Sequence, residues 1–201
     1  MTRSIETTRV ASAFFLSGAA ALVYQVAWQR LLFVIVGVDT ESVTIVVSTF
    51  MLGLGLGAVL GGWLADGSPR RILLAFCAFE AGIAAFGLVS VDLMLSTSVL
   101  FAGLPRGLAA ALSFALLVLP TVCMGATLPM LVAHAYQTSR NIGVSTGTLY
   151  FINTLGAALG TLAMGWFLLY WLDLREAVRV AAGLNLLASA VIGVGLIGRP
   201  A

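Results

Sequence analysis

Apolar residues run along this chain in six long stretches, which short polar segments separate. The stretches cover residues 10–38, 42–65, 72–91, 107–133, 143–172 and 177–198. A helix needs about 20 apolar residues to cross the roughly 30 Å hydrocarbon core of a bilayer, and each stretch reaches that length. The stretches are apolar on every face, whereas the strands of a membrane barrel alternate between polar and apolar residues. The pattern therefore predicts an all-α, polytopic membrane protein with six transmembrane helices.

The polar segments between the stretches are short and hold most of the charges. Asp39 and Glu41 mark the first break, and the later breaks lie at 66–71, 92–106, 134–141 and 173–176. Because the breaks are short, we expect residues 1–201 to form a single six-helix transmembrane domain.

Composition agrees with this picture and narrows the classes of function. The hydrophobic fraction is 61% and the charged fraction 9%, whereas a soluble domain is about half apolar and a quarter charged. The buried core of a soluble protein of this length cannot hold so large an excess of apolar residues, which argues against a soluble enzyme or a disordered tail. The net charge is only +2, which gives no basic patch for a polyanion. The lipid bilayer is the expected partner, and nucleic acid is not.

The distribution of arginine predicts the orientation, since cytoplasmic loops of membrane proteins carry more basic residues. With the N-terminus inside, four arginines fall on or near the outer side and six fall on the cytoplasmic side: Arg3, Arg9, Arg70, Arg71, Arg140 and Arg199. The first stretch is too long for the core of a signal peptide. We therefore expect a multi-pass membrane protein with cytoplasmic N- and C-termini.

The chain resembles itself when it is shifted by 103 residues, which lays the second stretch on the fifth. The shift pairs Leu52-Gly53 with Leu155-Gly156, Leu56-Gly57 with Leu159-Gly160, and Gly62-Trp63 with Gly165-Trp166. A repeat of three helices, about 10–91 and about 107–198, would place the second copy upside down. That is the 3+3 inverted repeat of one half of many secondary transporters, a major-facilitator-type half. The alternative is that membrane helices simply favour Gly and Trp.

The repeated glycines have a structural reason of their own. Gly53, Gly57 and Gly61 recur every four residues and share one helix face, as do Gly156 and Gly160. Small residues at this spacing let two helix backbones approach closely within lipid. We expect these glycines to serve helix packing, or else to form a surface on which helices slide during conformational change.

Polar side chains within the stretches are the candidates for function, since they are costly in hydrocarbon. The depth of each side chain in the membrane, counted along its stretch at about 1.5 Å per residue, predicts two polar layers. One lies around Glu80 and Asn153 and the other around Gln25, Gln29 and Asn185. Glu80 is either a protonatable residue of a solute pathway or a structural acid with a polar partner. Arg30 with Trp28 is typical of an anchor at the membrane surface. The candidates for a solute pathway are Gln25, Gln29, Arg30, Glu80, Asn153 and Asn185.

Residues for catalysis or metal binding form no recognisable pattern. Cys77 and Cys123 are isolated in separate stretches, and His134 is the only histidine. Neither a disulfide nor a zinc site is indicated, and no nucleophile–base motif appears. We therefore expect no catalytic residues, no metal and no cofactor, and we predict that the chain is not an enzyme.

The segment GWLADGSPRR at 62–71 resembles the cytoplasmic signature between helices 2 and 3 of the major facilitator superfamily. Gly67 and Pro69 stand where that signature has a basic residue and a second glycine, so the match is partial. In that family the acid and the arginines latch helix ends in one transport state. The resemblance implies such a latch for Asp66, Arg70 and Arg71.

Three further segments, SGAAALVYQVAWQRLL at 17–32, MGATLP at 124–129 and YFINTLGA at 150–157, resemble the membrane domain of bacterial fused transporter/spermidine synthase proteins. The resemblance implies a location in a bacterial inner (plasma) membrane. In that family a soluble aminopropyltransferase-like domain follows the membrane part. Its catalytic residues have no counterpart in these 201 residues. The chain is thus expected to be a stand-alone membrane version, one product of a split gene, or a truncated piece.

These observations lead to one functional expectation and one alternative. The chain is expected to move a small solute such as a polyamine, as a homodimer or with a partner membrane or soluble subunit. Alternatively, it is a non-transporting structural or accessory subunit of a larger membrane complex.

Overall fold

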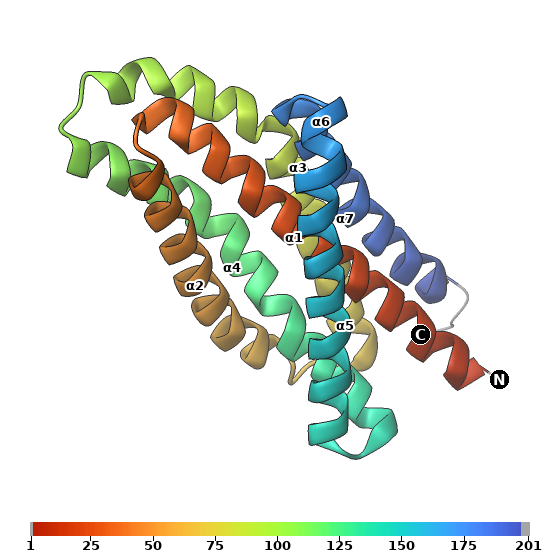
Figure 1. Ribbon diagram of the computed structural model, residues 1–201. Helices are drawn as coiled ribbons and strands as arrows, with labels where there is room; N and C mark the ends of the chain where they lie inside the picture. The colour runs from red at the N-terminus through yellow and green to blue at the C-terminus, as the bar shows by residue number, and fades with distance from the viewer. Residues whose placement is uncertain (1, 198–201) are drawn as a thin grey trace.

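The computed structural model describes residues 2–197, except for the side chains of 2–4, 36, 99–102 and 106. Within this range the chain is helical, with no strand. Figure 1 shows a bundle of long helices in which α1 begins and α7 ends at the same end. The elements are α1 (Thr2–Val36), α2 (Asp39–Leu64), α3 (Pro69–Ala102), α4 (Arg106–Ser139), α5 (Ile142–Ala163), the π-helical turn η1 (Met164–Leu168), α6 (Leu169–Trp171) and α7 (Leu174–Ile197).

The described residues contain six helices that are long and apolar enough to cross a membrane. These are Ile5–Ile35, Asp39–Leu64, Pro69–Ser98, Gly107–Ser139, Ile142–Trp171 and Leu174–Ile197. The fifth span joins α5, η1 and α6, so the sequence analysis missed the π-helical turn. The prediction of an all-helical protein with six helices long and apolar enough to span a membrane is confirmed for these residues. Arg199 and the end of the sixth stretch at Gly198 lie outside the described residues.

Local residue chemistry accounts for several helix ends. Gly37 follows α1 with a φ of +77°, the left-handed backbone conformation that glycine adopts at a helix C-terminus without a Cβ clash. Asn141 caps α5, because its side-chain Oδ1 accepts a hydrogen bond of 3.1 Å from the backbone N–H of Val144. Such a bond satisfies one of the unpaired donors of the first helical turn.

The third predicted break, 92–106, is largely wrong, because α3 continues as a helix to Ala102. The hydroxyls of Ser96, Thr97 and Ser98 donate to backbone carbonyls three or four residues earlier in the same helix. These bonds satisfy the three hydroxyl groups within the helix itself. A hydroxyl-rich segment that ends an apolar stretch therefore remains helical, and Asp92 lies within a helix.

Helix α1 occupies the centre of the bundle and packs against α5, α7, α2, α3 and α4. It is also the span with the largest buried share. Toward one end its Tyr24 and Trp28 rings stack with centroids 4.9 Å apart, inside a buried apolar cluster. Toward the other end Phe14 packs in a second cluster with Phe76. Helix α1 thus lies between the pair α2 and α4 on one side and α7 on the other, whereas α4 also contacts α5 directly.

Glycines mark the two closest helix contacts. A Cβ on Gly57 of α2 would overlap the Val122 carbonyl of α4, and Gly53 and Gly61 also face α4 at overlapping distance. On α5, Gly156 and Gly160 face the backbone of α1 in the same way. Close backbone approach gives dense van der Waals packing where lipid removes the hydrophobic drive between helices.

Replacing Gly57 with alanine is expected to destabilise the bundle by about 1–3 kcal/mol, because the added methyl overpacks the α2–α4 contact. Gly55→Ala is the matched control on the same helix, since nothing lies within 4 Å of its added Cβ. That control gains helix propensity and is expected to be neutral or stabilising by about 0.5–1 kcal/mol. Thermal unfolding in detergent measures both, and equal effects of the two variants would contradict the packing described here.

Candidate functional site

A carboxylate in the interior of the bundle joins three helices. Glu80 of α3 is fully buried, as are its two partners, Ser17 of α1 and Asn185 of α7. The Ser17 hydroxyl donates to Glu80 Oε1 at 2.6 Å, and Asn185 Nδ2 donates to Glu80 Oε2 at 2.6 Å. The three side chains therefore form one compact polar cluster, the Glu80 cluster, at the α1–α3–α7 junction.

The predicted division of polar residues into two layers is wrong for Asn185, which contacts Glu80. The Arg175–Asp92 ion pair shows why, because it marks which residues of α7 and α3 lie at the same level. Glu80 is twelve residues from Asp92, and Asn185 is ten residues from Arg175. The two therefore lie at nearly equal depth, given a rise of about 1.5 Å per residue. The prediction counted the depth of Asn185 from Arg179, which lies about one turn inward of Arg175, and so placed Asn185 too close to the outer end of the bundle.

Ser17 was not among the candidates, although it is one of the few hydroxyls in the first stretch. The number of residues between Ser17 and Glu80 is nearly repeated by a second pair along the α1–α3 contact, where Trp28 Nε1 donates to Ser90 Oγ at 3.0 Å. Between these two bonds, Tyr24 Oη is buried against Gly87. A comparison of polar spacings between the two stretches could have found this series.

Polar bonds also tie α3 to α7 one turn away from the Glu80 cluster. Cys77 Sγ donates to the Ser189 carbonyl at 3.4 Å, and Ser189 Oγ donates to the Cys77 carbonyl at 3.3 Å. A groove of about 480 Å³ between these helices is lined by Cys77 and Ser189 and reaches Arg70 at the end of the bundle. The groove thus leads from the surface to the turn next to Glu80.

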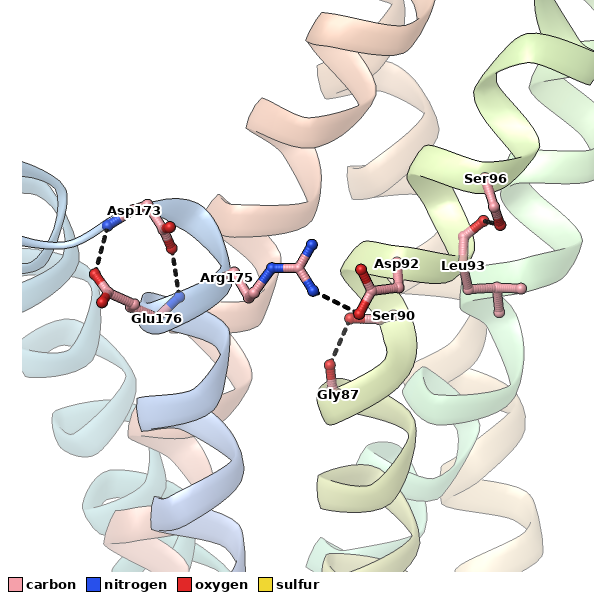
Figure 2. Close-up of polar contacts among 8 residues, drawn as sticks. All are labelled: Gly87, Ser90, Asp92, Leu93, Ser96, Asp173, Arg175 and Glu176. Carbon is pink, nitrogen blue, oxygen red and sulfur yellow. Dashed lines mark hydrogen bonds and ion pairs between the residues drawn. The ribbon is translucent and has the colours of Figure 1, made fainter.

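At the opposite end, α3 and α7 are joined by an ion pair (Figure 2). Arg175 Nη1 lies 2.5 Å from Asp92 Oδ2, and both side chains are well exposed. Beside it, Asp173 Oδ1 accepts from the Glu176 backbone N–H at 2.7 Å, and Glu176 Oε2 accepts from the Asp173 backbone N–H at 3.1 Å. This reciprocal capping box fixes the start of α7, and with it the position of Arg175.

The candidates on α1 lie in different surroundings. Gln25 is half-buried, and Arg30 is exposed. Gln29 Nε2 donates to Asp39 Oδ1 at 3.0 Å and so joins α1 to the start of α2. Trp28 is completely buried, so its predicted role as a surface anchor is wrong. Its indole N–H has a buried partner, Ser90, which removes the need to reach the membrane surface.

The other candidates lie apart from the Glu80 cluster. Asn153 is half-buried on α5 and approaches Gly18 of α1, where a Cβ would lie 2.7 Å from Asn153 Oδ1. Asp66, Arg70 and Arg71 are exposed around the loop between α2 and α3. Among the described side chains, no ion pair joins these three.

A cavity of about 170 Å³ opens between α1, α4 and α5 at the end where α1 begins. Glu6 and His134 are its ionisable lining residues, and Glu6 Oε1 lies 3.1 Å from His134 Nε2. Its remaining walls combine apolar side chains with hydroxyls, namely Thr7, Val10, Ala11, Ala135, Thr138, Ser139, Val144, Ser145, Thr148, Leu149 and Ile152. We call it the α1–α4–α5 cavity.

The described part of the chain holds no group of three or more His, Cys, Asp or Glu side chains that could bind a metal ion. Cys77 and Cys123 are both free thiols. Two polar features therefore remain for function, the Glu80 cluster and the α1–α4–α5 cavity.

No protein-family model matches this chain, and no solved structure matches it. The chain is similar to a protein of Corynebacterium efficiens named "Polyamine aminopropyltransferase", with 29% identity over 183 residues. The match covers 87% of this chain and 33% of the relative. The chain thus spans about a third of the length of the curated relative that it matches.

This match contradicts the prediction that the chain is not an enzyme, because the relative is named as an aminopropyltransferase. The prediction considered only motifs within these 201 residues, most of which lie in membrane-spanning helices. The resemblance to fused spermidine synthases had already pointed to an aminopropyltransferase-like domain, but the prediction was made for the residues present alone. We therefore withdraw it.

Replacing Ser17 with alanine is expected to destabilise the protein by about 1–3 kcal/mol, since Glu80 Oε1 loses its donor within a buried site. Ser12→Ala is the matched control, because Ser12 is exposed on the same helix and surface substitutions usually stay within about 0.5 kcal/mol. Chemical or thermal unfolding in detergent compares the two. If Ser17→Ala were as stable as Ser12→Ala, the bond to Glu80 would have no structural role.

Proposed function

We propose that this chain is the transmembrane domain of a protein related to polyamine aminopropyltransferases and that it binds and moves a polyamine. The observation that carries the proposal is the match itself, in which most of a six-span chain aligns with a third of a protein named for polyamine chemistry. The arginine distribution supports an inner-membrane location with both termini in the cytoplasm.

The packing of the helices supports a 3+3 inverted repeat. Such a repeat relates α1 to α4, α2 to α5 and α3 to α7. The chief partner of α2 is α4, and the chief partner of α5 is α1, which is the same interface under that exchange. Each interface has glycines on both sides, with Gly125 of α4 facing α2 and Gly18 of α1 facing α5. This pairing favours half of a facilitator-type fold, with α3 and α7 meeting where the copies join.

The α1–α4–α5 cavity suits one end of a polyamine. Its carboxylate, from Glu6, and its hydroxyl oxygens are acceptors for a primary ammonium group. Its apolar walls suit the methylene groups of the same molecule. Ile152 lines the cavity, and the next residue, Asn153, lies at the α1–α5 contact beside Gly18. A solute that enters from the end where α1 begins would therefore meet the Glu6 carboxylate.

Half of a facilitator fold needs a second half, since a complete pathway lies between two such units. The outer faces of α2 and α5 expose large apolar side chains, and Trp63 and Trp166 are each 75% exposed. We propose that a second copy, or a partner subunit, completes the pathway. In that assembly Asp66, Arg70 and Arg71 would act as the cytoplasmic latch, and their exposure leaves them available for such contacts.

Spermidine uptake into proteoliposomes that contain the purified protein tests the proposal. We expect saturable uptake above that of empty liposomes, and a loss of roughly tenfold in Glu6→Gln, because an ammonium group loses a charged acceptor. Glu41→Gln is the matched control, since Glu41 lies at the opposite end of the bundle, and it is expected to match the parent.

Two outcomes would contradict the proposal. Uptake equal to that of empty liposomes, for the parent protein reconstituted with whatever purifies with it, would remove the transport function. Firm co-purification with other membrane proteins, without spermidine binding, would instead support an accessory subunit. An equal loss in the Glu6 and Glu41 variants would remove the α1–α4–α5 cavity from the pathway.

A further inference from the structure

The hydrogen bonds of the Glu80 cluster fit an ionised carboxylate. Such a group only accepts hydrogen bonds, and its two oxygens lie within bonding distance of two donors, the Ser17 hydroxyl and the Asn185 amide nitrogen. Both partners are neutral. When Glu80 is ionised, its charge is therefore stabilised by hydrogen bonds from neutral groups.

Among the described side chains, we find no cation that neutralises Glu80 when it is ionised. Two described titratable groups that sense Glu80 are Tyr24 of α1 and Cys77 of α3, and both are acids. Among the side chains that the structure describes, no cation forms an ion pair with Glu80. A buried charge without a counter-ion is expensive, and the usual remedy is uptake of a proton or another cation.

The partners of Glu80 can accommodate its neutral form as well. A serine hydroxyl both donates and accepts, and an asparagine amide carries a donor at one end and an acceptor at the other. Asn185 Oδ1 is buried with no hydrogen-bond partner among the described residues. A half-turn of the amide would offer this oxygen to a protonated Glu80, while Ser17 still donated to the other carboxyl oxygen. Asn185 Oδ1 is thus an acceptor that is available for a hydrogen bond from the protonated carboxyl group of Glu80.

The tightness of the cluster decides which cation fits. Both partner atoms lie 2.6 Å from the carboxylate oxygens, which leaves no gap between them for a metal ion or an ammonium group. A proton needs no such gap. The groove between α3 and α7, lined by Cys77 and Ser189, runs from Arg70 at the end of the bundle to the turn next to Glu80, and it is the route we assign to the proton.

We propose that Glu80, Ser17 and Asn185 form an exchangeable proton-binding site, in which a proton from solvent adds to a carboxyl oxygen of Glu80. The Asn185 amide turns to accept from the resulting O–H group, so the hydrogen bond between α3 and α7 reverses its direction. The proton is released by the same route, and no other bond is made or broken. The site couples protonation to the junction of α1, α3 and α7, and it does not depend on which solute the protein carries.

Infrared difference spectroscopy on the reconstituted protein tests this site. Titration from alkaline to acidic pH is expected to produce the C=O band of a buried carboxylic acid, which shifts in D₂O and disappears in Glu80→Gln. The glutamine offers both a donor and an acceptor to Ser17 and Asn185, so this variant is expected to fold. Glu41→Gln is the matched control and retains the band.

A second variant covers a failure of Glu80→Gln to fold. The chain has three other glutamates, Glu6, Glu41 and Glu176, and their joint replacement by glutamine leaves Glu80 as the only one. With ¹³C-labelled glutamate, the remaining band then belongs to Glu80. Asn185→Leu is expected to move the midpoint of this band without abolishing it, because the reversible partner is lost.

Three results would overturn the proposal. The first is the absence of a protonated band from Glu80 over the pH range in which the protein stays folded. The second is a band that changes neither with pH nor in D₂O, which would mean that the proton never exchanges. The third is loss of the band on addition of Na⁺ or spermidine at constant pH, which would assign the site to that cation. None of these readouts depends on spermidine uptake, so the site and the proposed function can fail separately.

Discussion

Lipid removes the force that folds soluble proteins, and this constraint shapes the whole molecule. An apolar side chain gains little by moving from a lipid tail to a neighbouring helix, so helices associate through close packing and polar bonds. Both kinds of contact are present here. Glycines bring α2 against α4 and α5 against α1, whereas hydrogen bonds and an ion pair tie α3 to α7 and α1.

The two kinds of contact have different consequences for the movement of helices. Glycine contacts consist of backbone against backbone, and they depend on shape alone. The polar contacts at the α1–α3–α7 junction depend on which atom donates and which accepts, so a single proton can change them. A protein built in this way has firm glycine contacts between α2 and α4 and between α1 and α5, and a chemically sensitive contact at the α1–α3–α7 junction. That division suits a chain in which part of the bundle must respond to charge.

The fold was largely accessible from the sequence, and the site was only partly so. Six spans follow from hydropathy, because each helix must satisfy its backbone within its own length. The helix bounds were less accurate where hydroxyls such as Ser96 continue α3 beyond the apolar stretch. Glu80 stood out as an acid within a span, but its partners depended on the relative depth of α3 and α7. That depth follows from the packing of α3 against α7 and is marked by the contact between Asp92 and Arg175, which lie 83 residues apart in the chain.

The sequence by itself determined that the chain lies in a membrane, where its helices cross, and which polar residues are costly there. These properties follow from local composition and from the length that a bilayer requires. Only the tertiary structure decided that Glu80 meets Ser17 and Asn185, and that Trp28 is buried beside Ser90 instead of lying at the surface. The reason is physical, since the register and rotation of each helix are set by its neighbours, and apolar faces on every side leave no pattern from which to infer them.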